Sequence, residues 1–220
     1  MPKVTRKVRL GPPIAEARNF IAIGLNYADH AKEFGSQQQT HPTIFMKNPA
    51  SATGAGTVLL PRFLRSDAVD YEAELAVVIG RDCHNVTPAQ ALDYVLAYTC
   101  ANDVSARDWQ KEWGGGQWCR GKSFDTFCPL GPWIETDFVP GTQRITATLN
   151  GEIKQDAHLN DMIFKVPDII HFVSQVMTLL PGDVIITGTP AGIGPMPAKS
   201  TIAVSIEGLG QLTNRVSAQP

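Results

Sequence analysis

Residues 71–79 carry the sequence YEAELAVVI, which has the length and the β-branched, apolar content of a buried strand. Two glutamates, Glu72 and Glu74, lie within it, with one residue between them. Because side chains alternate between the two faces of a strand, both carboxylates are expected on the same face. Like charges this close are costly to fold together unless a cation or a proton relieves them. The segment predicts either a metal site at the edge of the core or a solvated polar face, and the spacing alone does not separate these two.

A third carboxylate follows the next predicted strand. This strand covers residues 96–103, and Asp103 stands at its end. If the two strands are neighbours, Asp103 adds a third oxygen ligand beside Glu72 and Glu74. Carboxylates with no histidine or cysteine nearby form a hard-oxygen site, which suits Mg²⁺, Mn²⁺ or Ca²⁺ and not zinc. If these carboxylates do bind a metal, the donor set predicts a cation of the Mg²⁺, Mn²⁺ and Ca²⁺ class.

A possible general base lies earlier in the chain. A short apolar strand is predicted at residues 20–25, followed by a short helix at 28–34 that Gly35 ends. His30 and Glu33 are three residues apart in this helix and share one face. The carboxylate can orient the imidazole and raise its basicity, so the pair could take a proton from water. The same spacing is common on helix surfaces that have no catalytic role.

Three further polar side chains follow Asp103. We expect a helical turn at residues 105–110, which would place Arg107 and Gln110 on one face near the carboxylates. Arginine binds carboxylates in a bidentate manner, and Lys122 near a cation could stabilise an enolate. Thr189 lies in a glycine-rich turn that could present backbone N–H groups to an anion. This turn matches neither a P-loop nor a GxGxxG motif, so nucleotide binding is not predicted.

The remaining pattern favours strands over helices. Residues 144–149 alternate, and Asn150-Gly151 behind them is a strong hairpin signal. Thr87 and the following proline predict a helix to about Tyr94, and Pro167 opens a second helix with apolar residues at helical spacing. Two more strands are expected at residues 184–187 and 201–206. The pattern predicts an α+β, mainly β domain and argues against a doubly wound parallel sheet.

Length and composition are those of one globular domain. The chain has 220 residues, of which 43% are apolar and 18% charged, and its net charge is −2. This balance offers no footprint for nucleic acid or an anionic membrane. No apolar run approaches the roughly 20 residues of a membrane span, and residues 1–10 lack the apolar part of a signal peptide. The four cysteines have no metal-binding spacing and are expected to be free, mostly buried thiols. We expect a cytoplasmic protein without nucleic-acid or membrane partners.

Five segments, in the same order, resemble the fumarylacetoacetate hydrolase family. The likeness extends from about residue 20 to residue 216. The acylpyruvase and fumarylacetoacetate-hydrolase-domain-containing branch is the most similar, while residues 115–133 are also similar to bacterial members that act on diketo sugar acids. The segments are residues 24–30 (GLNYADH), 71–80 (YEAELAVVIG), 102–110 (NDVSARDWQ), 121–133 (GKSFDTFCPLGPW) and 181–195 (PGDVIITGTPAGIGP).

The resemblance assigns a role to each candidate residue. It implies a mixed β-roll or distorted barrel with peripheral helices, usually a homodimer. It also implies a single catalytic domain at residues 19–217, after a short N-terminal segment at 1–18. By resemblance, the metal ligands are Glu72, Glu74 and Asp103, the water-activating pair on a lid is His30 and Glu33, the active-site lysine is Lys122, and the contacts to the substrate's carboxylate or oxo group are Arg107, Gln110 and Thr189.

These roles predict an Mg²⁺-dependent hydrolase that cleaves a carbon–carbon bond of an acylpyruvate-like or diketo acid. Water activated by the lid pair would attack a carbonyl two carbons from the 2-oxo group, and a pyruvate-type enolate would leave. The same site could serve a 2-oxo acid isomerase or a decarboxylase, including one for oxaloacetate, in an aromatic degradation pathway. A non-catalytic metabolite binder is a further alternative, against which the His30–Glu33 pair argues. The substrate beyond its 2-oxo acid head stays open.

Overall fold

The computed structural model describes residues 11–14, 17–33, 35, 39–62, 66–113 and 115–219. The expectations for residues 1–10, for Phe34 and for most of the N-terminal segment lie outside these ranges.

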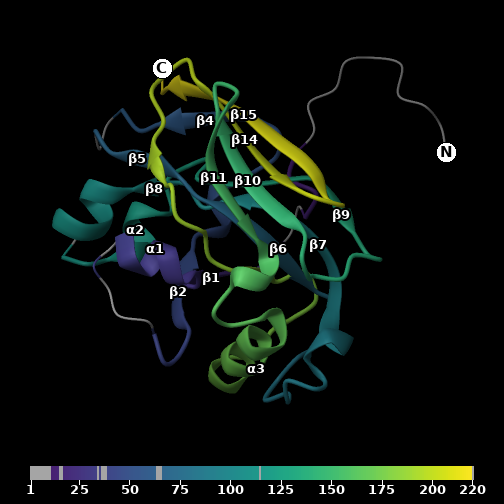
Figure 1. Cartoon of the computed structure of the whole chain (residues 1–220). Helices are drawn as coiled ribbons and strands as arrows, with labels where there is room; N and C mark the ends of the chain where they lie inside the picture. Colours follow the sequence, from purple (N-terminus) through teal and green to yellow (C-terminus); the bar gives the residue numbers. More distant parts are fainter. Residues whose placement is uncertain are drawn as a thin grey trace.

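The residues that the structure describes form three β-sheets (Figure 1). The largest has the order β2-β1-β12-β6-β7-β9-β3, with β1 (Phe20–Gly24), β2 (Thr43–Lys47), β3 (Ala52–Thr53), β6 (Ala73–Ile79), β7 (Val95–Asn102), β9 (Cys128–Glu135) and β12 (Val184–Ile186). The second has the order β11-β10-β14-β15-β4, with β4 (Gly56–Leu60), β10 (Arg144–Leu149), β11 (Glu152–His158), β14 (Thr201–Ile206) and β15 (Gly210–Ala218). A small sheet joins β13 (Gly194–Pro195), β5 (Val69–Tyr71) and β8 (Ser105–Ala106).

The helices are short and lie around the sheets. The described α-helices are α1 (Ala28–Glu33), α2 (Trp118–Gly121) and α3 (Val166–Val176). Single turns of 3₁₀-helix cover Pro49–Ser51, Ala91–Tyr94 and Leu159–Asp161, and a π-helical turn covers Asp108–Glu112. Figure 1 shows α1 and α2 together on one side of the sheets and α3 at another end. The mainly β, curled arrangement confirms the predicted fold class. No helix within the described ranges is both long and apolar enough to cross a bilayer.

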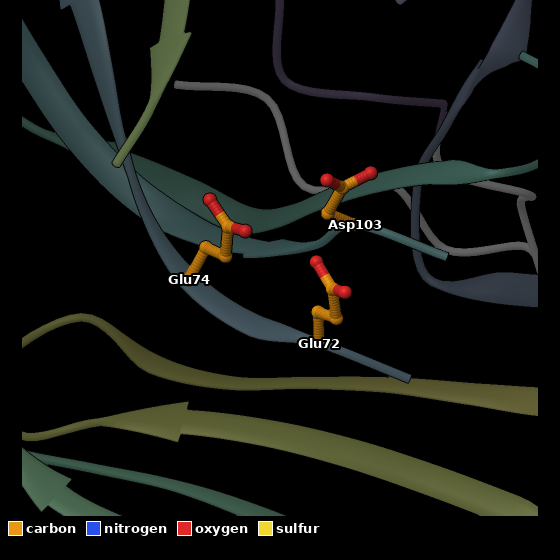
Figure 2. Close-up of side chains that lie close together, drawn as sticks. All are labelled: Glu72, Glu74 and Asp103. Carbon is orange, nitrogen blue, oxygen red and sulfur yellow. The ribbon is translucent and has the colours of Figure 1, made fainter. Parts of the chain in front are cut away.

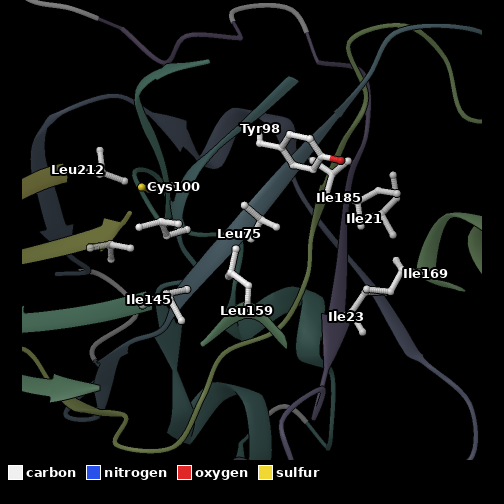
Figure 3. Close-up of a cluster of buried hydrophobic side chains, with 14 of the residues drawn as sticks. Ile21, Ile23, Leu75, Tyr98, Cys100, Ile145, Leu159, Ile169, Ile185 and Leu212 are labelled. Carbon is white, nitrogen blue, oxygen red and sulfur yellow. The ribbon is translucent and has the colours of Figure 1, made fainter. Parts of the chain in front are cut away.

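Strand β6 runs through the hydrophobic core, and every one of its residues is buried. Leu75 contributes to the larger core cluster together with Ile145 of the second sheet, as Figure 3 shows. Ala76 points to the opposite face and joins a smaller cluster with Phe20 and Ile186. Because both faces are covered, the strand is apolar without interruption apart from its acidic start. Glutamates in such a strand are removed from solvent.

The predicted strand at 71–79 is not continuous in the structure. The structure divides it at Glu72 into β5, which belongs to the small sheet, and β6, which belongs to the large one. The helical turn expected at 105–110 also begins later, at Asp108. Ser105 and Ala106 form β8 instead, because they pair with Asp70 and Val69 of β5. A long-range partner thus replaces the local helical conformation.

The helix predicted from Thr87 to Tyr94 is wrong in its first half. The Thr87 hydroxyl donates to Gln90 Oε1 at 2.8 Å. The residues that follow Thr87 form turns, and a helical conformation, of the 3₁₀ type, begins only at Ala91 and ends at Tyr94. Leu92 is 45% exposed, so a longer helix would have gained little burial here. By contrast, the hairpin at Asn150-Gly151, helix α3 and strands β12 and β14 lie where they were expected. The four cysteines are free, and Cys119 alone among them is exposed, which confirms their predicted state.

Asn26 fixes the start of helix α1. This fully buried side chain donates to the carbonyl oxygens of Thr187 at 2.7 Å and Phe164 at 3.0 Å, and it accepts from the Phe164 N–H at 2.7 Å. Three hydrogen bonds to two distant segments are needed because a buried amide is costly when unpaired. They place α1, which carries His30, beside the end of β12.

Candidate active site

Three carboxylates converge beside the break between β5 and β6. The register of β6 with β7 pairs Glu74 with Ala101, so Asp103 follows opposite Glu72, and its N–H donates to the Glu72 carbonyl at 2.9 Å. One oxygen from each carboxylate lies within 4.8 Å of the others, and Figure 2 shows the three groups pointing toward one another. Glu72 is 4% exposed, Glu74 1% and Asp103 0%. The alternative of a solvated strand face is therefore wrong.

Buried cations neutralise two of these carboxylates. Lys122 Nζ donates to Glu72 Oε2 at 2.9 Å and to Asp103 Oδ2 at 2.6 Å. Lys47 forms an ion pair with Asp103, and Arg107 forms one with Glu72. Glu74 accepts the Gly188 N–H at 2.6 Å and has no ion pair among the described residues. Within the described part of the chain, the charge of Lys122 works to lower the pKa of Glu74, but Lys122 forms its ion pairs with the other two carboxylates.

The pKa shifts follow this distribution of charge. Burial works to raise the pKa of Glu72, but Lys122 and Arg107 outweigh it and hold that pKa well below its usual range. For Glu74, burial and the neighbouring Asp103 and Glu72 raise the pKa well above its usual range. A divalent cation among the three carboxylates would relieve this repulsion. The oxygen-only donor set and the unpaired Glu74 fit a hard cation of the Mg²⁺, Mn²⁺ and Ca²⁺ class.

Helix α1 brings an acid–base pair to the same place. His30 Nδ1 lies 3.1 Å from Glu33 Oε2, and the other oxygen, Oε1, accepts the Gly192 N–H at 2.8 Å. His30 is only 4% exposed. Its burial lowers the pKa of the imidazole, and the opposing effects of Glu72 and Glu33 do not compensate for it. A neutral histidine oriented by a carboxylate is suited to accept a proton.

One pocket collects most of the predicted residues. It is small, and it is lined on its polar side by His30, Glu72, Glu74, Arg107, Gln110, Lys122 and Thr189. Its other side is apolar and is formed by Ile23, Leu25, Phe45 and Trp118. The Phe45 and Trp118 rings meet edge to face at 5.3 Å, and Lys122 Nζ lies 5.0 Å from the centre of the Phe45 ring. A small molecule with an anionic head and a less polar remainder fits such a division.

The predicted active-site lysine, Lys122, and the predicted substrate contact Thr189 both form hydrogen bonds within the protein. The three N–H groups of the Lys122 ammonium meet Glu72, Asp103 and Ser105, the last at 2.7 Å. The Thr189 hydroxyl donates to the Ala73 carbonyl at 2.9 Å and accepts from Gln155 at 2.8 Å. A substrate would therefore have to exchange one of these contacts. The roles of Lys122 and Thr189 toward a substrate stay predictions.

Arg107 and Gln110 form a unit in the same way. Arg107 donates to Gln110 Oε1 at 2.9 Å and to Asp70 at 2.8 Å, besides its ion pair with Glu72. Gln110 is buried and lines the pocket. Because Arg107 uses its amide oxygen, its amide nitrogen is the group that could donate a hydrogen bond to a ligand. Their contact with a substrate carboxylate also stays a prediction.

Sequence reasoning did not find Lys47. This residue ends β2 and is 1% exposed. The signal was a lysine at the end of an otherwise apolar run, TIFMK, because lysine is almost never fully buried unless it is paired. Asp70 and Ser105 were missed as well. Their positions in the sequence do not indicate burial or a partner, since both are ordinary polar residues in short strands.

Comparisons with known proteins identify the family of this chain. Residues 19–217 match the C-terminal domain of fumarylacetoacetate hydrolase. A protein of Mycobacterium tuberculosis is 47% identical over 213 residues, which cover 95% of this chain and 78% of the relative. The chain belongs to the fumarylacetoacetate hydrolase family, whose members include hydrolases and isomerases.

Two solved structures show both kinds of member. The 5-carboxymethyl-2-hydroxymuconate delta-isomerase from Mycobacterium smegmatis is 44% identical, with a TM-score of 0.88 over 96% of this chain and 83% of its own. The fumarylacetoacetate hydrolase from the psychrophilic Exiguobacterium antarcticum is 41% identical, with a TM-score of 0.89 over 99% and 81%. Family membership and fold are thus established at a level of identity that still admits either activity.

Proposed function

We propose that the protein is an Mg²⁺-dependent hydrolase that cleaves a carbon–carbon bond in an acylpyruvate-like or diketo acid. The observation that carries the proposal is one pocket that is lined by His30 together with Glu72 and Glu74, two of the three clustered carboxylates. A base and a cation site that share one pocket are the two parts that hydrolysis of a β-diketone needs. A binder without catalysis has no need of the His30–Glu33 pair.

Glu72, Glu74 and Asp103 would hold the cation, which would supply Lewis-acid polarisation of the 2-oxo acid head. The protein's own residues do the rest. His30, kept neutral by burial and oriented by Glu33, takes a proton from the water that attacks the distal carbonyl. Lys122 carries a raised pKa, because Asp103 and Glu72 outweigh its burial, so its ammonium stays charged and can stabilise the departing enolate.

A direct assay tests this proposal. Purified protein is incubated with acetylpyruvate and Mg²⁺, and the loss of the diketone absorbance is followed. We expect turnover that EDTA abolishes and Mg²⁺ restores, and no turnover in His30→Ala. Absence of turnover on a panel of acylpyruvates and diketo acids, with Mg²⁺ binding retained, would refute the hydrolase and favour a binder.

The second candidate is an isomerase of 2-oxo or 2-hydroxydienoic acids, or a decarboxylase. Its support is the 44% identity to the delta-isomerase from Mycobacterium smegmatis. Isomerisation needs a base and the cation site but no attacking water, so the same residues could serve it. Product analysis separates the two reactions: hydrolysis in H₂¹⁸O labels the released carboxylate, whereas isomerisation and decarboxylation leave the products unlabelled at that position. Parallel assays with a hydroxydienedioate and with oxaloacetate complete the comparison.

A further inference from the structure

The loop at residues 188–194 is bound both to the carboxylate strand and to helix α1. At its start, the Gly188 N–H donates to Glu74 Oε2 at 2.6 Å. Near its end, the Gly192 N–H donates to Glu33 Oε1 at 2.8 Å. Only three residues therefore lie between the contact with the candidate metal site and the contact with the candidate base. The position of Glu33 depends on how firmly this loop is held.

Tyr71 holds the loop at its distal contact. Its hydroxyl donates to the Gly192 carbonyl oxygen at 2.9 Å, and its ring packs against Gly194, which pairs with it in the small sheet. Gly192 is thus hydrogen-bonded on both sides of its Cα, by Glu33 at the N–H and by Tyr71 at the carbonyl. Rotation of either peptide group would break one of these bonds.

Gly192 itself cannot be replaced without moving the backbone. Its φ is +97°, and an added Cβ would lie 2.1 Å from the carbonyl oxygen of Lys154 in β11. Behind this close approach, Gln155 of β11 donates to the Pro190 carbonyl at 2.7 Å. The loop is thereby pressed against β11 on one side, so its N–H groups are presented toward Glu74 and Glu33 on the other.

We propose that Tyr71 is a positioning residue that, through the two peptide groups of Gly192, fixes the Glu33 carboxylate against His30 and clasps helix α1 over the pocket. The expected effect on kcat rests on the proposed function, whereas the expected effect on the stability of the loop and of helix α1 does not. His30 touches the reacting water in the proposed reaction, and Glu33 orients His30. Tyr71 acts one step further away, on the loop that holds Glu33.

The test compares Tyr71→Phe with Tyr98→Phe, which makes the same chemical change in a tyrosine that packs against Phe138 in the core. Loss of one hydrogen bond to the loop should lower kcat for an acylpyruvate by roughly fivefold. KM and the Kd for Mg²⁺ should stay within about twofold, because the cation ligands keep their contacts. Amide hydrogen exchange at Gly192 and at Ala31–Glu33 of α1 should accelerate by roughly fivefold as well.

Tyr98→Phe should change none of these quantities. The proposal is overturned if Tyr71→Phe matches Tyr98→Phe in both kcat and exchange. It is also overturned if Mg²⁺ affinity falls in step with kcat, since Tyr71 would then support Glu72 next to it and not the loop. If the unmodified protein turns over no substrate on the panel, the proposed hydrolase fails. The exchange measurement still decides whether Tyr71 holds the loop, and through it helix α1, in place.

Discussion

Lys47 and Asp103 form an ion pair in which neither side chain has any exposure to solvent. Lys47 holds one oxygen of the carboxylate, and Lys122 holds the other at 2.6 Å. Asp103 is therefore fixed in orientation before any ligand binds. A buried pair of this kind contributes little net free energy compared with apolar residues, but the removal of one partner leaves a charge without compensation.

Lys47→Met should accordingly destabilise the protein by about 3 kcal/mol, measured as the free energy of unfolding in urea without metal. The physical reason is the Asp103 carboxylate oxygen that loses its partner in a solvent-free place. Lys32→Met serves as the control, because the Lys32–Asp29 pair has side chains that are 76% and 79% exposed. An exposed pair should contribute at most about 1 kcal/mol. Equal effects of the two substitutions would contradict this account.

Glu74→Gln should remove metal binding without unfolding the protein. Glu74 has no ion pair among the described residues, and a glutamine oxygen can still accept the Gly188 N–H. Without metal, the thermal midpoint should not fall below that of the unmodified protein, because a neutral amide replaces a carboxyl group that is costly to ionise where it is buried. Saturating Mg²⁺, at about 100 times its Kd, should stabilise the unmodified protein by about 2.7 kcal/mol and the variant not at all.

Glu152→Gln, at a 72% exposed side chain, is the matched control and should keep the full response to Mg²⁺. If Glu74→Gln is stabilised as much as the control, Glu74 is not a ligand.

The pH dependence of kcat/KM should report His30. Burial lowers the pKa of this imidazole from the usual 6.5, and only the neutral form can accept a proton. A lowered pKa means that the neutral base persists to lower pH, so the acid limb of the profile should lie below pH 6.5. Glu33→Gln removes two interactions that raise the pKa, the hydrogen bond and the charge, so it should move the limb to still lower pH and reduce the maximal rate. A limb that moves upward would exclude His30 as the titrating base.

Gly24→Ala should disturb the apolar wall of the pocket. A Cβ at Gly24 would lie 2.4 Å from Trp118 Cζ3, so the indole ring, which lines the pocket, has to shift. Loss of about 1 kcal/mol of contact with a bound substrate should raise KM roughly fivefold, with a small effect on thermal stability. Gly56→Ala, where an added Cβ meets nothing within 4 Å, should leave KM unchanged. Unchanged KM in both variants would show that substrate does not reach Trp118.

Much of the fold could be predicted where a pattern is local. Helix α3, the hairpin at Asn150-Gly151 and strands β1, β12 and β14 follow from periodicity and turn residues. The structure departs from prediction where a distant partner decides, as when β8 forms in place of a helical turn because Ser105 pairs with Asp70. Strand β4 was not predicted; its ladder partner, β15, lies more than 150 residues away along the chain.

The shared face of Glu72 and Glu74, and the place of Asp103 directly after the next strand, could be predicted from the residues alone, because side-chain alternation is a property of the extended backbone. The groups that surround the three carboxylates could not be predicted in this way. Lys47 reaches Asp103 across 56 residues, and Glu33 reaches Gly192 across 159. No local periodicity predicts either contact. The first depends on how the strands pair in the sheet, and the second depends on a loop that packs against β11. The carboxylates thus follow from the local sequence pattern, while their counter-charges and the contact between Glu33 and Gly192 arise from long-range packing.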